Sequence, residues 1–147
     1  MKKISYIKEI NHWREDFRFY IPINIRFSET DMFGHVNNVS AFIYFEEARI
    51  EYLKSINLFK NLSSPKAVPV VSDLQCDYHH PIYFQNELKL YVKTAEVGQT
   101  SFDLHYLGVN EKGEICLTGR GRMVYVDTVT GKAVKLSDEM KDKLQSL

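Results

Sequence analysis

The sequence predicts an α+β fold in which one antiparallel β-sheet packs against one long buried helix. Residues 38–57 contain neither glycine nor proline, and their apolar residues recur with the spacing of one helical face. Four segments with a period of two follow, joined mainly by short connections, which is typical of antiparallel strands. A further alternating segment, residues 21–27, precedes the helix. Together these patterns predict a single layer of sheet with the helix on its concave face.

The first predicted strand, residues 21–27, alternates apolar and polar side chains as a half-buried strand does. Pro22 fits only near a strand start or at a sheet edge. The residues before it carry aromatic side chains that we expect to pack onto the domain: Trp13, Phe17, Phe19 and Tyr20. We therefore expect one domain over residues 1–147, with an N-terminal extension at 1–20 and a core at 21–127.

The helix predicted at residues 38–57 has an apolar stripe opposite a charged face. The stripe consists of Ala41, Phe45, Ala48, Tyr52 and Ile56, flanked by Phe42 and Leu53. Residues 39–45 are apolar almost all round, which predicts deeper burial of the first half than of the second. Asn57 is suited to end the helix in a left-handed conformation.

Four strands are expected after the helix, at residues 70–78, 87–97, 101–109 and 114–127, with a loop at 61–66 before the first. Gly113 suits positive φ in the last turn. The last strand places Gly119 and Gly121 on its apolar face, where they would let the helix approach closely. That face is predicted to hold Ile115, Leu117, Gly119, Gly121, Met123 and Tyr125. Ser137 is expected to cap a short helix at residues 137–146.

The composition narrows the class of protein. Lysine and arginine total 19, as do aspartate and glutamate, which argues against a protein that coats nucleic acid. Cys76 and Cys116 fall in predicted strands and are expected to be reduced, buried thiols, with no Cys/His spacing typical of a metal site. Neither a secretion signal nor an apolar run long enough for a membrane span is present. We expect a soluble, cytoplasmic protein.

The stretch from Thr30 to Asn38 concentrates residues suited to chemistry. Asp31 and a pair of asparagines lie directly before the predicted helix start. A helix N-terminus carries unpaired backbone N–H groups and partial positive charge. A carboxylate beside such amides suits acyl transfer, because the amides polarise a carbonyl while the acid attacks it or activates water.

The same residues also have structural interpretations. Position alone favours Asp31 as a turn or cap residue. Gly34 suits an unusual turn, and a lone histidine such as His35 is more often a structural hydrogen-bonding residue. The side chains of Asn37 and Asn38 suit helix capping, so a function for Asn38 depends on its backbone N–H.

Candidates outside this stretch have alternatives as well. Glu46 can pair with Arg49 three residues on, or reach the site from the border of the apolar stripe. Tyr44 is a candidate lining residue of an acyl channel, with core packing as the alternative. His79 and His80 are interpreted as loop or interface residues, because neighbouring strand residues point to opposite faces.

Three cationic side chains, one lysine and two arginines, are candidates to bind phosphate groups. The alternative for the two arginines is an exposed position or one that faces a dimer partner. The three candidates are Lys93, Arg120 and Arg122.

The order of elements and the Thr30 to Asn38 stretch together resemble the hotdog-fold thioesterases of the 4-hydroxybenzoyl-CoA thioesterase-like or acyl-CoA thioesterase type. The resemblance covers roughly residues 20–127. Relatives often carry Gly-Asp before the position of Glu87, where this chain has Gln85 and Asn86. The matching residues are Asp31, Gly34, His35, Val36, Asn37, Asn38, Tyr44, Glu46, Ala48, Arg49, Tyr78, Pro81, Glu87 and Leu88.

This resemblance implies a sheet wrapped around the central helix and hydrolysis of acyl-CoA, with acyl-carrier-protein thioesters as the second choice. Asp31 would be nucleophile or general base, the Asn38 N–H would polarise the carbonyl, and no metal or prosthetic group would be needed. Gly34, His35, Val36 and Asn37 would lie beside the substrate. Homodimers, with sites at the dimer interface, would pair further into tetramers.

Two other functions stay open for such a fold. One is a catalytically silent acyl-CoA-binding or regulatory module, and the other is a dehydratase or hydratase that pairs a histidine with an acid. The sequence leaves the acyl chain and the choice between dimer and tetramer open.

Overall fold

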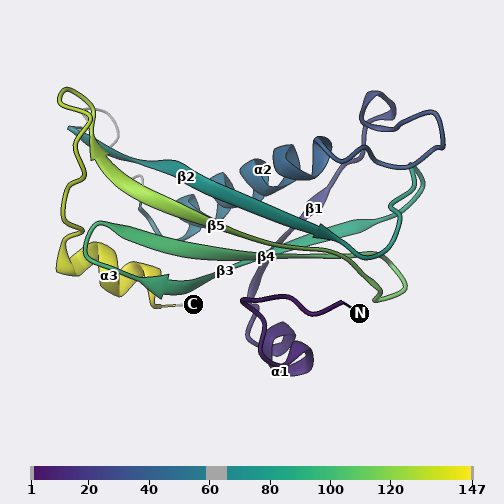
Figure 1. The fold of residues 1–147 in the computed structure, drawn as a ribbon, viewed down its shortest axis with the longest axis horizontal. Helices are drawn as coiled ribbons and strands as arrows, with labels where there is room; N and C mark the ends of the chain where they lie inside the picture. The colour runs from purple at the N-terminus through teal and green to yellow at the C-terminus, as the bar shows by residue number, and fades with distance from the viewer. Residues whose placement is uncertain (1, 59–65, 147) are drawn as a thin grey trace.

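The computed structural model describes residues 2–58 and 66–146 of the chain. Within them, five strands form one antiparallel sheet in the spatial order β1-β3-β4-β5-β2. The strands are β1 (Phe19–Ile23), β2 (Ala67–Tyr78), β3 (Leu88–Val97), β4 (Ser101–Val109) and β5 (Ile115–Asp127). The helices are α1 (Ile10–Glu15), α2 (Ser40–Ser55) and α3 (Asp138–Leu144). The sheet curves around α2, and α1 lies against its other face (Figure 1), so the predicted α+β arrangement is confirmed.

The predicted ends of several elements were wrong, and β2, expected to start at residue 70, begins at Ala67. The first strand was expected at 21–27, but β1 covers Phe19–Ile23 and Phe27–Glu29 forms a 3₁₀ turn. That turn is stabilised locally, since Arg26 N–H donates to Glu29 Oε1 at 2.8 Å. The boundary drawn at residue 20 therefore falls inside β1. Helix α2 begins two residues later than expected because residues 38 and 39 form a turn, and Asn57 adopts a positive φ of 58° just beyond its end.

The structure agrees with the expectations for Pro22, Gly113 and Ser137. β1 is an edge strand, which is compatible with Pro22. Gly113 has a φ of +77°, and Ser137 accepts a hydrogen bond from Met140 N–H at the start of α3. The loop predicted at 61–66 lies outside the described residues except for Lys66, and β2 begins directly after it. None of the helices in the described part of the chain has the length and apolar character needed to cross a bilayer.

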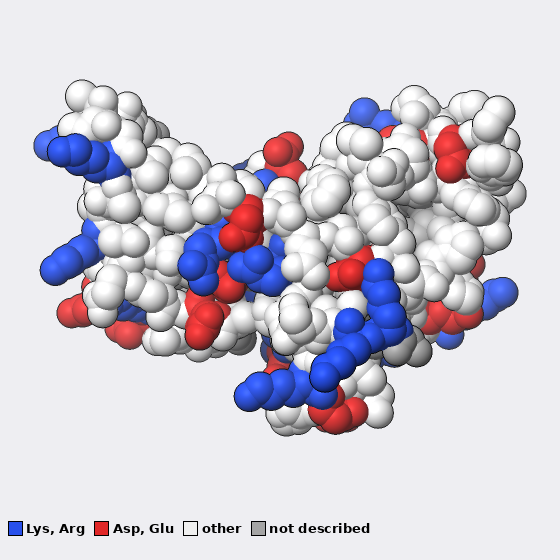
Figure 2. Space-filling model, viewed as in Figure 1, with Lys and Arg blue, Asp and Glu red and all other residues white. Residues whose placement is uncertain are grey.

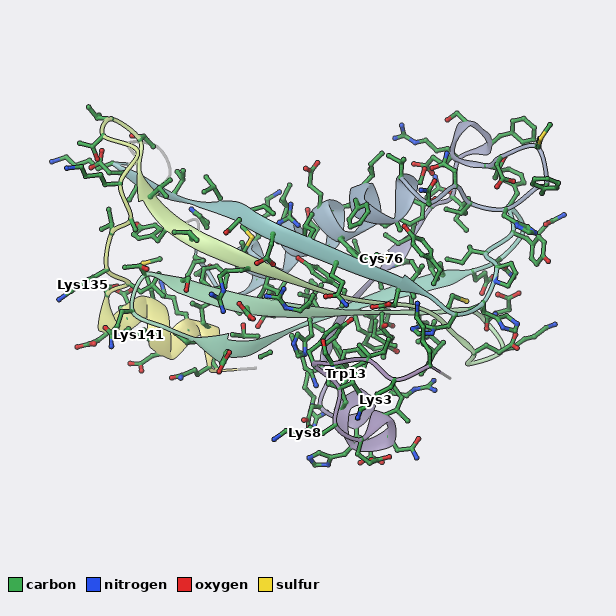
Figure 3. All side chains as sticks on the ribbon, viewed as in Figure 1. Lys3, Lys8, Trp13, Cys76, Lys135 and Lys141 are labelled. Atoms are coloured by element: carbon green, nitrogen blue, oxygen red, sulfur yellow. The ribbon has the colours of Figure 1, made fainter. Side chains whose placement is uncertain are left out.

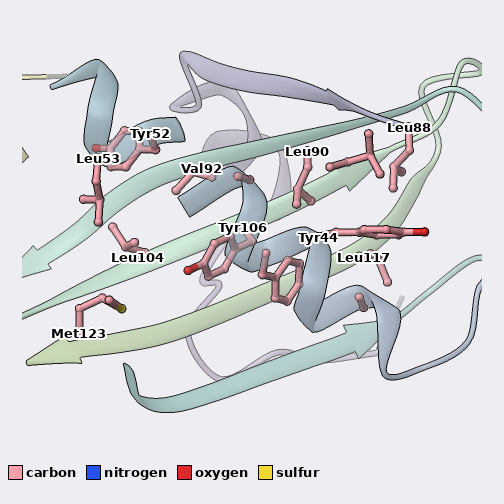
Figure 4. Close-up of a cluster of buried hydrophobic side chains, with 14 of the residues drawn as sticks. Tyr44, Tyr52, Leu53, Leu88, Leu90, Val92, Leu104, Tyr106, Leu117 and Met123 are labelled. Atoms are coloured by element: carbon pink, nitrogen blue, oxygen red, sulfur yellow. The ribbon is translucent and has the colours of Figure 1, made fainter. Parts of the chain in front are cut away.

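Helix α2 packs its predicted stripe against the sheet (Figure 4). Ala41, Phe45, Ala48, Tyr52 and Ile56 are all buried. The ring of Phe45 stacks on Tyr106 of β4 with centroids 4.4 Å apart and planes 12° apart. These contacts anchor the middle of the helix to the middle of the sheet.

The first half of the helix, which was expected to be buried more deeply than the second, is not buried on all sides. Val39 is 63% exposed and Ile43 is 51% exposed. The reason is that one sheet layer covers only one side of α2, so apolar residues on the opposite side have no cover within the described residues. This uncovered side lies next to the candidate site described below.

The two glycines of β5 serve different neighbours. A Cβ at Gly119 would lie 2.5 Å from Phe45 Cε2, so this glycine admits the helix as expected. A Cβ at Gly121 would meet Leu74 of β2 at 2.6 Å, and therefore this glycine admits a neighbouring strand instead. Ile115 was also misplaced: an irregularity in the β4–β5 pairing shifts the alternation, and Ile115 packs with Trp13 and Phe17 on the other face.

The N-terminal extension covers the face of the sheet opposite α2. Trp13 and Phe17 are buried against Leu107 and Val109 of β4, and Figure 3 shows Trp13 between α1 and the sheet. Trp13 Nε1–H donates to His105 Nδ1 at 2.8 Å, which requires that ring nitrogen to be unprotonated. Lys93 Nζ donates to the carbonyl of Trp13 at 2.7 Å, and this holds the extension from the β3 side.

Acidification is expected to weaken the fold through His105. Burial, together with the Lys93 and Arg120 charges and against the opposing effect of Asp103, lowers the pKa of His105 from about 6.5 to about 4. An unfolded histidine takes up its proton near pH 6.5, so the unfolded state binds more protons between pH 6.5 and 4. Stability is therefore complete above pH 6.5 and falls by up to about 3 kcal/mol as the pH drops to 4.

Urea unfolding followed across this pH range measures the effect. His105→Asn keeps an acceptor for Trp13 without the proton uptake, so its stability should change less between pH 6.5 and 4. His12→Gln, at an exposed position of α1, is the matched control and should behave as the wild type. A pH dependence unaltered by His105→Asn would contradict the assignment.

Candidate active site

Asp31 lies in a tight turn between the 3₁₀ turn and α2. Its N–H donates to the carbonyl of His35 at 2.7 Å, and Gly34 takes a φ of +78° to close the turn. Asp31 Oδ1 accepts from the N–H groups of Phe33 at 2.9 Å and His35 at 3.2 Å. The carboxylate is thus fixed through one oxygen, and its other oxygen, Oδ2, has no hydrogen-bond partner among the described residues.

The start of α2 supplies free backbone donors. Asn37 Oδ1 accepts from Ser40 N–H at 2.9 Å, so the capping interpretation of Asn37 is confirmed. The N–H groups of Asn38 and Val39 have no acceptor among the described residues. A carbonyl oxygen brought to this helix end would meet unpaired donors and the positive end of the helix dipole.

Asp31 and Asn38 line the same pocket, which has a volume of about 400 Å³. Its walls come from the Asp31 turn, the start of α2, the end of β2 with the chain after it, and one residue of β5. Apolar and polar groups both contribute, which suits a ligand with an acyl part and a polar head. The lining residues are Asp31, His35, Val36, Asn37, Asn38, Ala41, Tyr78, His79, His80, Pro81, Ile82 and Leu117.

Three candidates from the sequence do not line this pocket. Gly34 shapes the turn through its φ. Tyr44 is buried and its hydroxyl donates to Glu29 Oε1 at 3.0 Å; burial, together with this bond, raises the pKa of Tyr44. Glu46 is exposed and lies 3.9 Å from Arg49, the pairing expected from their spacing. Substrate contacts by these residues stay predictions.

The candidate phosphate-binding cations are engaged within the chain. Lys93 lies 3.8 Å from Asp16 and packs over the Phe17 ring. The two arginines pair with carboxylates on the face away from α2, and Figure 2 shows both signs side by side in the middle of one face. The pairs are Arg120–Asp73 at 2.8 Å, Arg120–Asp103 at 3.0 Å and Arg122–Asp103 at 3.0 Å. Phosphate binding by these cations stays a prediction and would compete with these ion pairs.

The sequence alone assigned no role in the site to the pocket wall formed by residues 78–82, at the end of β2 and directly after it. Tyr78, the last residue of β2, donates its hydroxyl hydrogen to the carbonyl of Asn38. His79 and His80 diverge, as adjacent residues of an extended chain do: His79 Nε2 lies 2.8 Å from Thr118 Oγ1, and His80 Nε2 lies 3.0 Å from Glu114 Oε2. The available signal was the Tyr78 to Pro81 match within the resemblance, which marks this wall without assigning its contacts.

The two thiols form no disulfide and do not line this pocket. Cys76 is half-buried, Cys116 is buried, and neither forms a disulfide. Burial raises the pKa of Cys76 to about 12 and that of Cys116 to about 11. Both are therefore protonated, poorly nucleophilic side chains at neutral pH.

Comparisons with known proteins identify the family of the chain. The model of the thioesterase-like superfamily matches residues 25–144. The chain is 47% identical over 145 residues to the uncharacterized protein YsmA of Bacillus subtilis (strain 168), covering 98% of this chain and 97% of that protein. It is 23% identical over 126 residues to the long-chain acyl-CoA thioesterase FadM of Escherichia coli (strain K12), covering 85% of this chain and 96% of that protein.

Solved structures give the same result for the fold. A crystal structure of a thioesterase from Thermus thermophilus, complexed with coenzyme A and zinc, superposes with a TM-score of 0.76 at 28% identity. The match covers 90% of this chain and 95% of that one. The predicted hotdog fold is confirmed, and the chain belongs to the thioesterase-like superfamily.

Proposed function

We propose that the protein is a thioesterase that hydrolyses acyl-CoA to a free acid and coenzyme A. The observation that carries the proposal is the shared pocket of Asp31 and the unpaired Asn38 N–H. Family membership and the likeness to FadM support thioester hydrolysis as the reaction. The coenzyme A in the related Thermus thermophilus structure supports coenzyme A as the leaving group.

Two courses of reaction use the same residues. In one, water gives its proton to Asp31 and its oxygen attacks the carbonyl carbon; the C–S bond then breaks and the thiolate takes up a proton. In the other, the Asp31 carboxylate attacks, the thiolate leaves, and water hydrolyses the resulting anhydride. In both, negative charge develops on the carbonyl oxygen, where the Asn38 N–H stabilises it.

A homodimer is part of the proposal. Strand β2 is an edge of the sheet over 12 residues and pairs only with β5 in the described part of the chain. An unpaired edge of this length is a template for a second copy. The exposed Val39 and Ile43 lie on the uncovered side of α2 and are suited to contact that copy.

A thiol-release assay on the wild-type protein tests the proposed reaction. Short, long and aromatic acyl-CoAs are offered separately, followed by the same acyl groups on acyl-carrier protein. We expect release from at least one acyl-CoA and slower release from the carrier-protein thioesters. Tight acyl-CoA binding by calorimetry without any release would overturn hydrolysis in favour of a silent binding module. Hydration of an enoyl-CoA without thiol release would overturn it in favour of a hydratase.

A further inference from the structure

Hydrogen bonds fix the backbone before and after the Asn38 N–H, which itself has no acceptor among the described residues. Before it, Asn37 N–H donates to the carbonyl of Glu29 at 2.8 Å, and the Asn37 side chain caps Ser40. After it, the Asn38 carbonyl accepts the hydrogen bond from the Tyr78 hydroxyl. The direction of the Asn38 N–H depends on the backbone dihedrals that these contacts fix. The contact with Tyr78 links the start of α2 directly to the sheet.

Tyr78 is itself fixed by its neighbours at the end of β2. The N–H of His79 donates to the carbonyl of Cys116 at 2.9 Å, and the His79 ring bonds Thr118 of β5. Thr118 has no exposed surface. The hydrogen bond between His79 and Thr118 therefore attaches the pocket wall to β5. The alternation along β5 places Thr118 on the face of the sheet away from α2.

The N-terminal extension covers the sheet beside the His79–Thr118 hydrogen bond. The Tyr6 ring lies 4.9 Å from that of His105, and its hydroxyl is buried without a hydrogen-bond partner among the described residues. Burial raises the pKa of Tyr6 to about 12, while the adjacent Thr118 hydroxyl acts against this rise. Lys2 pairs with Asp77, the residue before Tyr78, at 3.0 Å. This extension precedes the segment that matches the family, residues 25–144.

We propose that Tyr78 is a positioning residue for the Asn38 N–H, and that His79 and Thr118 set Tyr78 from the far face of the sheet, beneath the extension. The inference rests on the proposed function, since it assigns a support to the donor that polarises the carbonyl. A donor that is misdirected in the transition state lowers kcat more than it weakens ground-state binding.

Steady-state kinetics of Tyr78→Phe test the proposal. The ring stays and only the hydroxyl is lost, so we expect kcat to fall by about tenfold or more with KM within about twofold of wild type. Tyr20→Phe is the matched control because Tyr20 is 44% exposed, Tyr78 is 45% exposed, and Tyr20 lies on the edge strand β1. The control should keep the wild-type kcat.

Thr118→Val tests the far-face support. It removes the hydroxyl that bonds His79, and we expect a smaller loss of kcat, about threefold, again without a matching rise in KM. Thr94→Val removes a comparable bond, 2.7 Å to the Tyr52 hydroxyl, on β3 outside the pocket lining. Both threonine variants should lose similar stability, but only Thr118→Val should lose kcat.

Two results would overturn the proposal: a Tyr78→Phe enzyme with wild-type kcat, or equal losses of kcat in Thr118→Val and Thr94→Val. If the wild type releases no thiol from any substrate, the proposed function fails separately. The ¹⁵N–¹H signal of Asn38 then still decides the positioning role. We expect Tyr78→Phe to shift this signal and Tyr20→Phe to leave it in place; an unmoved signal in Tyr78→Phe would refute the contact.

Discussion

Asp31→Asn is expected to lower kcat for thioester hydrolysis by about 10²–10⁴-fold, the usual cost of removing an acid–base group. Asparagine retains a carbonyl oxygen that can accept from the N–H groups of Phe33 and His35, so the turn should persist. What is lost is the negative charge and the second carboxylate oxygen. Thiol release under substrate saturation measures kcat, and calorimetry with a non-hydrolysable acyl-CoA analogue checks that binding survives.

Asp127→Asn is the matched control for this change. Asp127 Oδ1 accepts from Val129 N–H at 2.8 Å and from Thr130 N–H at 2.9 Å, the same kind of turn contact outside the pocket lining. We expect its kcat to equal that of the wild type. An Asp31→Asn enzyme that turns over as fast as the control would remove Asp31 from the chemistry and leave it as a turn residue.

Gly119→Ala is expected to produce the largest loss of stability among single methyl additions, about 2–3 kcal/mol. The added Cβ would lie 2.5 Å from Phe45 Cε2 and 2.9 Å from the carbonyl oxygen of Gln75. The Phe45 ring has no room to retreat, because it is fully buried and stacked on Tyr106. The urea concentration at half-unfolding measures the loss, with the slope of the transition checked for constancy.

Gly121→Ala is the comparison for Gly119→Ala, because its added methyl group would meet a flexible side chain and not a rigid ring. Its Cβ would meet the end of the Leu74 side chain at 2.6 Å and the Asp73 carbonyl oxygen at 3.1 Å, and Leu74 can change rotamer. We expect a smaller loss than for Gly119→Ala. Combining Gly119→Ala with Phe45→Leu should restore part of the lost stability, and equal losses at both glycines would refute the packing argument.

Much of the fold follows from local patterns in the sequence. The stripe from Ala41 to Ile56 has one period over the whole helix, so its buried side could be read directly. The β4–β5 irregularity near Cys116 could not, because one inserted residue reverses the alternation without changing the composition. That is why Ile115 was assigned to the wrong face.

The site was predictable where its parts are neighbours in sequence. Asp31 and Asn38 are seven residues apart, and both line the pocket. Tyr78 and Thr118 come from other strands, and their contacts with Asn38 and His79 depend on the register of the β2–β5 pairing. The pairing of the arginines with Asp73 and Asp103 depends on the same kind of register, so their charges could be counted but not their partners.

Trp13, which the extension buries against the sheet, is the only tryptophan in the chain, so its emission reports on the extension without any added label. Indole emission reports the surroundings of that one side chain, whereas far-ultraviolet circular dichroism is dominated by the strands and helices. Release of the extension would change the emission while the dichroism stays constant, and loss of the whole fold would change both. A spectrometer can therefore distinguish departure of residues 2–18 from global unfolding with no label added.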